Sequence, residues 1–148
     1  MLIILLALAA TLYWITTQMS TPQIPASGKL NPQQIAALAQ NAGFTSNDLA
    51  TAVAIALAES GGNSAAYNPE TSAGAAQGKG SYGLWQIYLT AHPEYTAAQL
   101  LDPQTNANAA YSIYQAAGND FTPWSTYNSG AYMNYAAQAT AATGFEVA

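Results

Sequence analysis

The chain has few of the side chains that supply most enzyme chemistry. It contains no cysteine, no arginine, two lysines and one histidine, and charged residues make up 6% of its 148 residues. Without cysteine, disulfides, thiolate metal sites and a cysteine nucleophile are excluded. A single histidine, His92, cannot form a histidine metal cluster, and a net charge of −5 argues against binding to a phosphate backbone. The sequence therefore indicates no metal, no cofactor and no nucleic-acid partner, and its chemistry must come from carboxylates, hydroxyls and amides.

The N-terminal segment differs from the rest of the chain. Residues 1–19 carry no charge, and the run from Leu2 to Ile15 is almost wholly aliphatic. A spanning helix needs about 17 to 25 residues, whereas a cleavable signal normally starts with basic residues that are missing here. We expect residues 1–19 to be an uncleaved transmembrane anchor, and a removed signal peptide is the alternative. Residues 20–30 contain two prolines and a glycine, which is typical of a linker.

The remaining residues, 31–148, are expected to form one mainly helical domain. An asparagine, a proline and a glutamine at positions 31, 32 and 34 form a capping box, and Thr45 with Asp48 and Thr96 with Gln99 repeat that pattern. Such signals predict helices over residues 32–42 and 45–60, a short one from residue 96, a longer one over 103–118, and a last one over 131–140. The Gly-, Ser- and aromatic-rich residues 80–88 favour a loop or small hairpin.

Glu59 is the strongest candidate for a catalytic group. Residues 49–58 are apolar on every side except at Thr51, which predicts a central buried helix that ends at this carboxyl. Apolar neighbours and the negative end of the helix dipole both favour a neutral carboxyl and so raise its pKa. A protonated carboxylic acid is what glycosidic bond cleavage requires. The alternative is a solvated glutamate beside the glycine that ends the helix.

Three segments resemble motifs of one enzyme group. Residues 59–63 (Glu-Ser-Gly-Gly-Asn), 83–86 (Gly-Leu-Trp-Gln) and 126–130 (Thr-Tyr-Asn-Ser-Gly) occur in the order, and at roughly the spacing, of motifs in lytic transglycosylases and goose-type lysozymes. The resemblance extends over about residues 31–135. Two longer stretches, residues 80–87 and 121–132, resemble small phage-associated members of the group. It implies a compact lysozyme-like fold and peptidoglycan glycan strands as the substrate.

The resemblance also implies roles for single residues. By position, Glu59 matches the family's acid, Ser60 the residue after it, and Gln86 the glutamine of the second motif. Tyr127 and Asn128 match the tyrosine and asparagine of the third motif. We therefore expect Glu59 to be catalytic and the other four residues to bind substrate, although Asn128 beside a glycine is also typical of a capped turn.

Two positions depart from the family's pattern. Trp85 replaces the methionine of the second motif, and Thr126 replaces the alanine of the third. We expect these departures to alter the shape of the sugar subsites more than the chemistry. Tyr82, Trp85, Trp124 and Tyr127 offer flat surfaces against which a sugar ring can pack, with core packing as the alternative for each.

The predicted reaction follows from the lack of a second buried carboxylate. A retaining hydrolase needs a nucleophile and an inverting one needs a base, so a route with one carboxylate fits better. The resemblance implies cleavage of the MurNAc-GlcNAc bond with a 1,6-anhydro-MurNAc end, for phage entry or wall remodelling. A lysozyme-type hydrolase and a non-catalytic, membrane-tethered peptidoglycan-binding module are the alternatives.

The same reasoning predicts partners and location. Peptidoglycan and, through residues 1–19, the membrane are the expected partners, with other virion or envelope-complex proteins as further candidates. The catalytic domain is expected on the periplasmic side of a membrane or in a virion, or outside the cell if residues 1–19 are removed as a signal.

Overall fold

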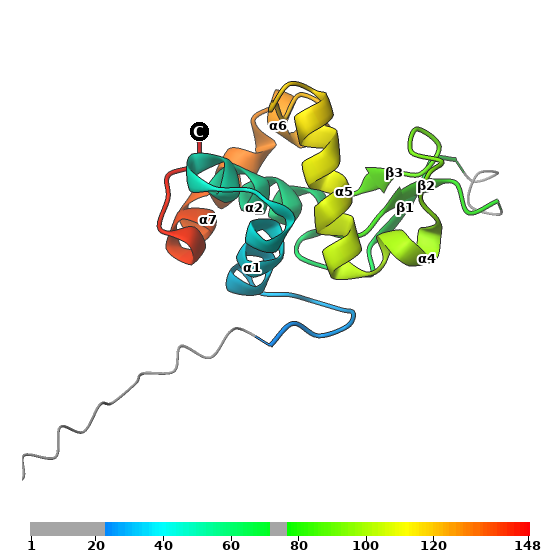
Figure 1. The fold of residues 1–148 in the computed structure, drawn as a ribbon, viewed down its shortest axis with the longest axis horizontal. Coiled ribbons are helices and arrows are strands. Elements are labelled where there is room, and N and C mark those ends of the chain that lie inside the picture. The colour runs from blue at the N-terminus through cyan, green and yellow to red at the C-terminus, as the bar shows by residue number, and fades with distance from the viewer. Residues whose placement is uncertain (1–22, 72–76) are drawn as a thin grey trace, which may run out of the picture.

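A computed structural model describes residues 23–71 and 77–148 of the chain (Figure 1). The predicted anchor, residues 1–19, lies outside the described residues, as does the start of the predicted linker. Among the helices of the two described stretches, none combines the length and the apolar character that crossing a bilayer requires.

The domain is mainly helical with one small sheet, as predicted. Its helices are α1 (Pro32–Ala42), α2 (Ser46–Ser60), α4 (Ala97–Leu100), α5 (Pro103–Ala116), α6 (Ser125–Asn128), the 3-10 helix η1 (Ala131–Tyr135) and α7 (Ala136–Thr143). The strands are β1 (Tyr67–Pro69), β2 (Gly80–Tyr82) and β3 (Ile87–Tyr88). Figure 1 shows the sheet and α4 at one end, α1, α2 and α7 at the other, and α5 between them.

Two of the predicted capping boxes are confirmed. The Gln34 backbone N–H donates to Asn31 Oδ1 at 2.9 Å, and the Asn31 N–H donates to Gln34 Oε1 at 3.0 Å. Thr96 and Gln99 make the same reciprocal pair at the start of α4. Each box satisfies backbone N–H groups that the helix itself leaves unpaired, and so fixes where the helix begins.

The capping box predicted at the start of α2 is wrong. Thr45 occupies the N-cap position but makes no side-chain capping hydrogen bond. Ser46, the first residue of α2, has a φ of 53°, so the chain does not enter the helix through an ordinary capping turn. The carboxylate of Asp48 instead accepts a hydrogen bond of 2.6 Å from the Tyr114 hydroxyl on α5. A tertiary contact has replaced the local one.

The C-terminal helix differs from the single helix predicted over residues 131–140. The chain first forms η1 and then α7, which continues to Thr143. Gly130 has a φ of 76°, so a left-handed turn separates α6, which was not predicted, from η1.

Helix α2 is the centre of the core, as its apolar sequence predicts. Every residue from Leu49 to Leu57 is buried, and α1, α7 and η1 contact it. Thr51, the one polar residue of this run, is satisfied because its hydroxyl accepts a hydrogen bond of 3.1 Å from the Ala148 backbone N–H. The helix is therefore held by neighbours along its length before it presents Glu59 at its end.

The sheet is antiparallel in the order β1-β2-β3, with Tyr82 paired to Tyr67 on one side and to Ile87 on the other. The hairpin predicted near residues 80–88 is thus confirmed as β2 and β3, and β1 adds a third strand. Residues 83–86 form the turn between β2 and β3 and carry the second motif next to the sheet.

Candidate active site

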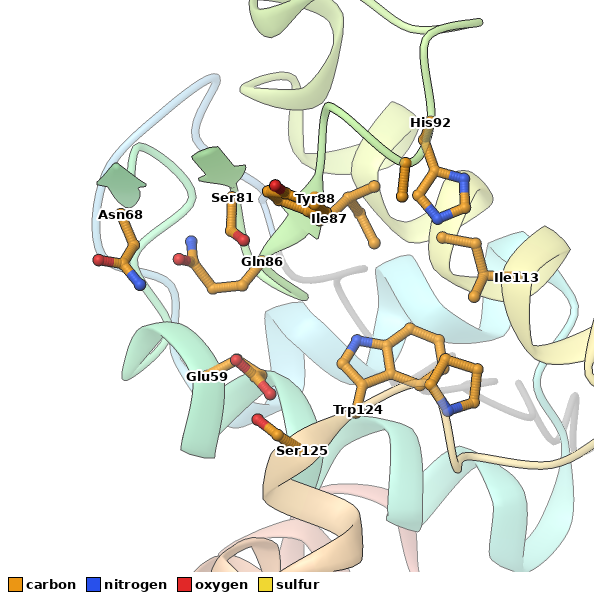
Figure 2. A pocket seen from close by; sticks show the side chains of 12 residues that line it. Glu59, Asn68, Ser81, Gln86, Ile87, Tyr88, His92, Ile113, Trp124 and Ser125 are labelled. Atoms are coloured by element: carbon orange, nitrogen blue, oxygen red, sulfur yellow. The ribbon is translucent and has the colours of Figure 1, made fainter. Parts of the chain in front are cut away.

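A cleft of about 470 Å³ lies between the sheet and the C-terminal end of α2 (Figure 2). It is lined by Glu59, Asn68, Ser81, Gln86, Ile87, Tyr88, Ala91, His92, Ile113, Pro123, Trp124 and Ser125. Figure 2 shows Asn68, Ser81 and Gln86 on the sheet side, facing Glu59 and Ser125. The cleft thus brings together one residue from each of the first two motifs, Glu59 and Gln86, and the residues just before the third.

Glu59 reaches the cleft because α2 ends directly after it. Gly61 takes a left-handed conformation with a φ of 60°, and its N–H donates to the Leu57 carbonyl, which stops the helix. The carboxyl of Glu59 is half-buried, and burial raises its pKa above the ordinary value of 4.5. Hydrogen bonding by Thr126 acts in the opposite direction but does not cancel the effect of burial. The rise predicted from the sequence is therefore present, with burial as its main cause.

Thr126 is in direct contact with this carboxyl. Its hydroxyl donates a hydrogen bond of 2.7 Å to Glu59 Oε1. The replacement of the family's alanine by Thr126 thus adds a hydrogen bond to the acid itself.

Gln86 lies in the same cleft as Glu59, as the motif comparison predicts. Its backbone has a φ of 47°, a left-handed conformation that is uncommon for a residue with a side chain. The side-chain Nε2 donates to the Gly83 carbonyl at 2.9 Å and lies 3.4 Å from the Ala66 carbonyl. Because the amide nitrogen is used in this way, the group that Gln86 can offer a ligand is its carbonyl oxygen, a hydrogen-bond acceptor.

Ser60 does not line the cleft. Its hydroxyl donates to the Ala56 carbonyl at 2.9 Å and accepts from the Gly62 N–H at 3.1 Å. Both contacts hold the end of α2, so the expected substrate contact is replaced by a structural one.

Trp85 of the second motif and Tyr82 just before it do not line the cleft, and the expectation that they contact substrate is corrected. Trp85 is 1% exposed, and its indole N–H donates to the Ala52 carbonyl in the middle of α2 at 2.9 Å. Tyr82 is 6% exposed, stacks on Tyr67 and donates its hydroxyl to the Gly78 carbonyl. Both rings are therefore part of the core or of the sheet, and neither offers a free face to a sugar.

Tyr127 and Asn128 of the third motif do not line the cleft. Tyr127 is half-buried and packs on Phe121 and Tyr132, outside the residues that line the cleft. Asn128 is exposed and donates from Nδ2 to the Thr122 carbonyl at 2.8 Å, which is the turn-bracing role that the sequence left open. Of the predicted acid and motif residues, the structure brings together Glu59 and Gln86, and Trp124, one of the four aromatic candidates, lines the same cleft.

Several lining residues were not predicted. Asn68 and Ser81 come from β1 and β2, Tyr88 from β3, and Ser125 from the start of α6. No motif singles out these residues, because they reach the cleft only through the pairing of the strands and the packing of α6.

His92, the single histidine of the chain, lines the cleft as well. Its Nδ1 lies 3.2 Å from Glu94 Oε1. Figure 2 shows it beyond Ile113 and Trp124, away from Glu59. Within residues 23–71 and 77–148, no group of three or more histidine and acidic side chains is arranged to hold a metal ion.

The fold and the cleft define a small helical domain that places one acid, at the end of a buried helix, opposite a short sheet. A family model described as a lysozyme-like domain matches residues 36–126, and the chain belongs to this family. The match confirms the resemblance to the lytic transglycosylase and lysozyme-like group, and it supports peptidoglycan degradation as the general activity. The comparisons with curated proteins and with solved structures gave no match.

Proposed function

We propose that this domain cleaves the MurNAc-GlcNAc bond of peptidoglycan as a lytic transglycosylase, with Glu59 as its acid and base. In the first step Glu59 gives its proton to the glycosidic oxygen, and the bond from that oxygen to C1 of MurNAc breaks. In the second step the 6-hydroxyl of the same MurNAc gives its proton to the Glu59 carboxylate while its oxygen bonds to C1. The products are a free GlcNAc hydroxyl and a 1,6-anhydro-MurNAc end, and no water is consumed.

One observation carries this proposal: Glu59 is the only carboxylate among the described residues that line the cleft. A retaining hydrolase needs two carboxyl groups about 5 to 5.5 Å apart, and an inverting one needs a second carboxylate to activate water. Glu70 and Glu94 are exposed, and Glu94 is paired with His92. A reaction whose nucleophile belongs to the substrate needs no second carboxylate.

The lining suits a glycan. Asn68, Ser81 and Gln86 supply amide and hydroxyl groups that can hydrogen-bond to sugar hydroxyls and acetamido groups. Ile113 and Trp124 give the opposite part of the cleft an apolar surface. A lining with several hydrogen-bonding groups suits a polar ligand such as a glycan strand.

The test is digestion of purified peptidoglycan by wild type, Glu59→Gln and Glu146→Gln, with the muropeptides resolved by mass. Glu146 is exposed and outside the cleft lining, so the same substitution there controls for loss of one carboxyl. We expect wild type and Glu146→Gln to yield products lighter by one water than hydrolytic ones, and Glu59→Gln to lose about 10² to 10⁴ in rate. Ordinary reducing ends would make the domain a lysozyme-type hydrolase. An active Glu59→Gln protein would refute the role of Glu59, and binding without cleavage by wild type would indicate a non-catalytic module.

We further propose that residues 1–19 tether the domain to a membrane on the side that faces peptidoglycan, for wall opening in phage entry or in wall remodelling. The uncharged aliphatic run from Leu2 to Ile15 supports this proposal. Intact-mass measurement and membrane fractionation of the full chain test it. A mature N-terminus near Ala10 or Ser20 would show that the segment is a removed signal.

A further inference from the structure

The hydrogen bond between Thr126 and Glu59 joins residues 67 positions apart in the chain and reaches the carboxyl on which the proposed reaction depends. We infer that Thr126 is a positioning residue: it holds Glu59 Oε1 as a hydrogen-bond acceptor, so that Oε2 is the oxygen that carries the acid proton. This inference rests on the function proposed above for Glu59, and it adds a residue that acts through the acid.

The chemistry of the two groups supports this assignment. A hydroxyl that donates to one carboxyl oxygen makes that oxygen the poorer site for the proton, since the proton would displace the hydrogen bond. The Thr126 backbone acts on the carboxyl in the same direction as the hydroxyl, because both lower the pKa of Glu59. The hydroxyl and the backbone of Thr126 thus both favour the ionised carboxyl, and the hydroxyl does so at Oε1.

The balance of these interactions suits a group that must act twice. Burial is the largest influence and keeps the carboxyl protonated at a higher pH than an exposed glutamate, as an acid requires. After Glu59 has given away its proton, the resulting carboxylate is only partly solvated because it is half-buried. A hydrogen bond to an ionised group is stronger than one to a neutral group, so the Thr126 hydroxyl stabilises this state most. Thr126 therefore stabilises the ionised Glu59 that must later accept the proton of the 6-hydroxyl.

The segment that carries Thr126 is itself fixed. The indole N–H of Trp124, two residues earlier, donates to the Trp85 carbonyl at 2.9 Å in the buried interior. On the other side, the Ser129 hydroxyl donates to the Thr126 carbonyl at 3.3 Å. The hydroxyl of Thr126 is thus presented to Glu59 by a braced turn, as positioning requires.

The experiment compares wild type with Thr126→Ala, Thr126→Val and Thr126→Ser in a carboxyl-carbon NMR titration and in a pH-rate profile. Selective ¹³C labelling of glutamate gives four signals, since the chain contains Glu59, Glu70, Glu94 and Glu146, and the Glu59→Gln variant identifies the first. Thr122→Ala is the control, because Thr122 is an exposed threonine four residues earlier and is not part of the cleft lining.

We expect Thr126→Ala and Thr126→Val to raise the pKa of Glu59, because both remove the hydroxyl while valine keeps the volume. Thr126→Ser and Thr122→Ala should titrate like wild type. On soluble glycan strands, kcat should fall about tenfold in the alanine and valine variants with little change in KM, and the alkaline limb of the profile should move to higher pH. Thr126→Ser, which keeps the hydroxyl, should have the kcat and the alkaline limb of wild type.

An unchanged Glu59 titration in both hydroxyl-free variants would overturn the inference, and so would a serine variant as impaired as the alanine one. The NMR titration needs no turnover, so it tests the contact even if Glu59→Gln proves active and the proposed function fails. If instead Glu59→Gln is inactive while the hydroxyl-free variants keep the wild-type kcat and pH profile, the proposed function stands and the role of Thr126 is refuted.

Discussion

The indole nitrogen of Trp124 donates a hydrogen bond to the backbone carbonyl of Trp85 across 2.9 Å in the interior of the domain. The indole of Trp85 in turn donates to the Ala52 carbonyl on α2, also at 2.9 Å. The two tryptophans therefore connect the helix that carries Glu59, the turn that carries Gln86 and the segment that precedes α6. The geometry of the cleft therefore depends on the hydrogen bonds of two buried indoles.

Trp124→Phe should weaken this connection. Phenylalanine keeps a ring in the site but leaves the Trp85 carbonyl without its donor, and an unpaired buried group costs about 1 to 3 kcal/mol. We expect the free energy of unfolding in urea to fall by that amount, and glycan cleavage to fall because Ser125 and Thr126 are no longer held in place. Tyr127→Phe, on the same segment, is the control and should stay within about 0.5 kcal/mol of wild type. A Trp124→Phe protein as stable as wild type would show that the hydrogen bond contributes nothing.

Asn106 should be more sensitive still. It is 0% exposed, its Oδ1 accepts from the Trp85 N–H, and its Nδ2 donates to the carbonyls of Tyr82 and Leu100, each at 2.9 Å. Asn106→Leu keeps the volume but leaves three buried backbone groups unpaired, so the free energy of unfolding should fall by at least about 3 kcal/mol. The ionised carboxylate of Asn106→Asp can still accept from the Trp85 N–H but cannot donate to the two carbonyls. Its loss of unfolding free energy should therefore be smaller at low pH, where the carboxyl regains a proton. Urea titrations at pH 4 and 7 check both, and a pH-independent loss in the aspartate variant would contradict this account.

Local signals allowed much of the fold to be predicted. The capping boxes at Asn31 and Thr96 join residues three apart, so the sequence alone contains all of the interaction. The burial of α2 follows from nine consecutive residues that have almost no polar side chain. Glu59 was predicted because an apolar helix end favours a neutral carboxyl and because three segments resemble the motifs of one enzyme group.

The rest of the site depends on contacts between distant residues. Trp124 and Trp85 are 39 positions apart, and Thr126 and Glu59 are 67 apart, so no spacing rule links them. Trp85 was expected beside the substrate because a tryptophan ring can pack against a sugar. A tryptophan is equally suited to a buried core, and the residue type alone does not distinguish the two. The position of Asp48 is typical of a capping box at the start of α2. Its carboxylate instead accepts a hydrogen bond from the Tyr114 hydroxyl, 66 residues away.

Gly83, the first residue of the second motif, should not tolerate a side chain. It has a φ of +77°, and a Cβ there would come within 2.4 Å of both Asn106 Nδ2 and the Leu100 carbonyl oxygen. Gly83→Ala combines left-handed strain with a clash against an amide held by three hydrogen bonds, so we expect a loss of more than about 2 kcal/mol. Gly118→Ala is a matched control, since Gly118 has a similar φ of +84° but open space around it. Equal losses in the two variants, measured by urea unfolding, would mean that the clash has no effect.

The raised pKa of Glu59 predicts how the stability of the domain depends on pH. Burial raises the folded pKa above the ordinary 4.5, so between these two values the folded state binds more protons than the unfolded state. The contribution of protonated Glu59 to the free energy of unfolding is therefore fully present below pH 4.5 and is lost as the pH rises through the folded pKa. Above that window the ionised carboxyl lies half-buried at the negative end of α2, which is unfavourable.

Glu59→Gln removes this titration while keeping the volume of the side chain. The difference in unfolding free energy, variant minus wild type, should therefore increase with pH across the window and then level off, and above the window the variant should be at least as stable as wild type. Glu146→Gln, which alters an exposed carboxyl, should show no comparable increase. Urea unfolding of the three proteins from pH 4 to pH 8 gives the comparison. A difference between Glu59→Gln and wild type that stays constant over this range would mean that folding does not raise the pKa of Glu59, and the argument that this carboxyl is held neutral for acid catalysis would lose its physical basis.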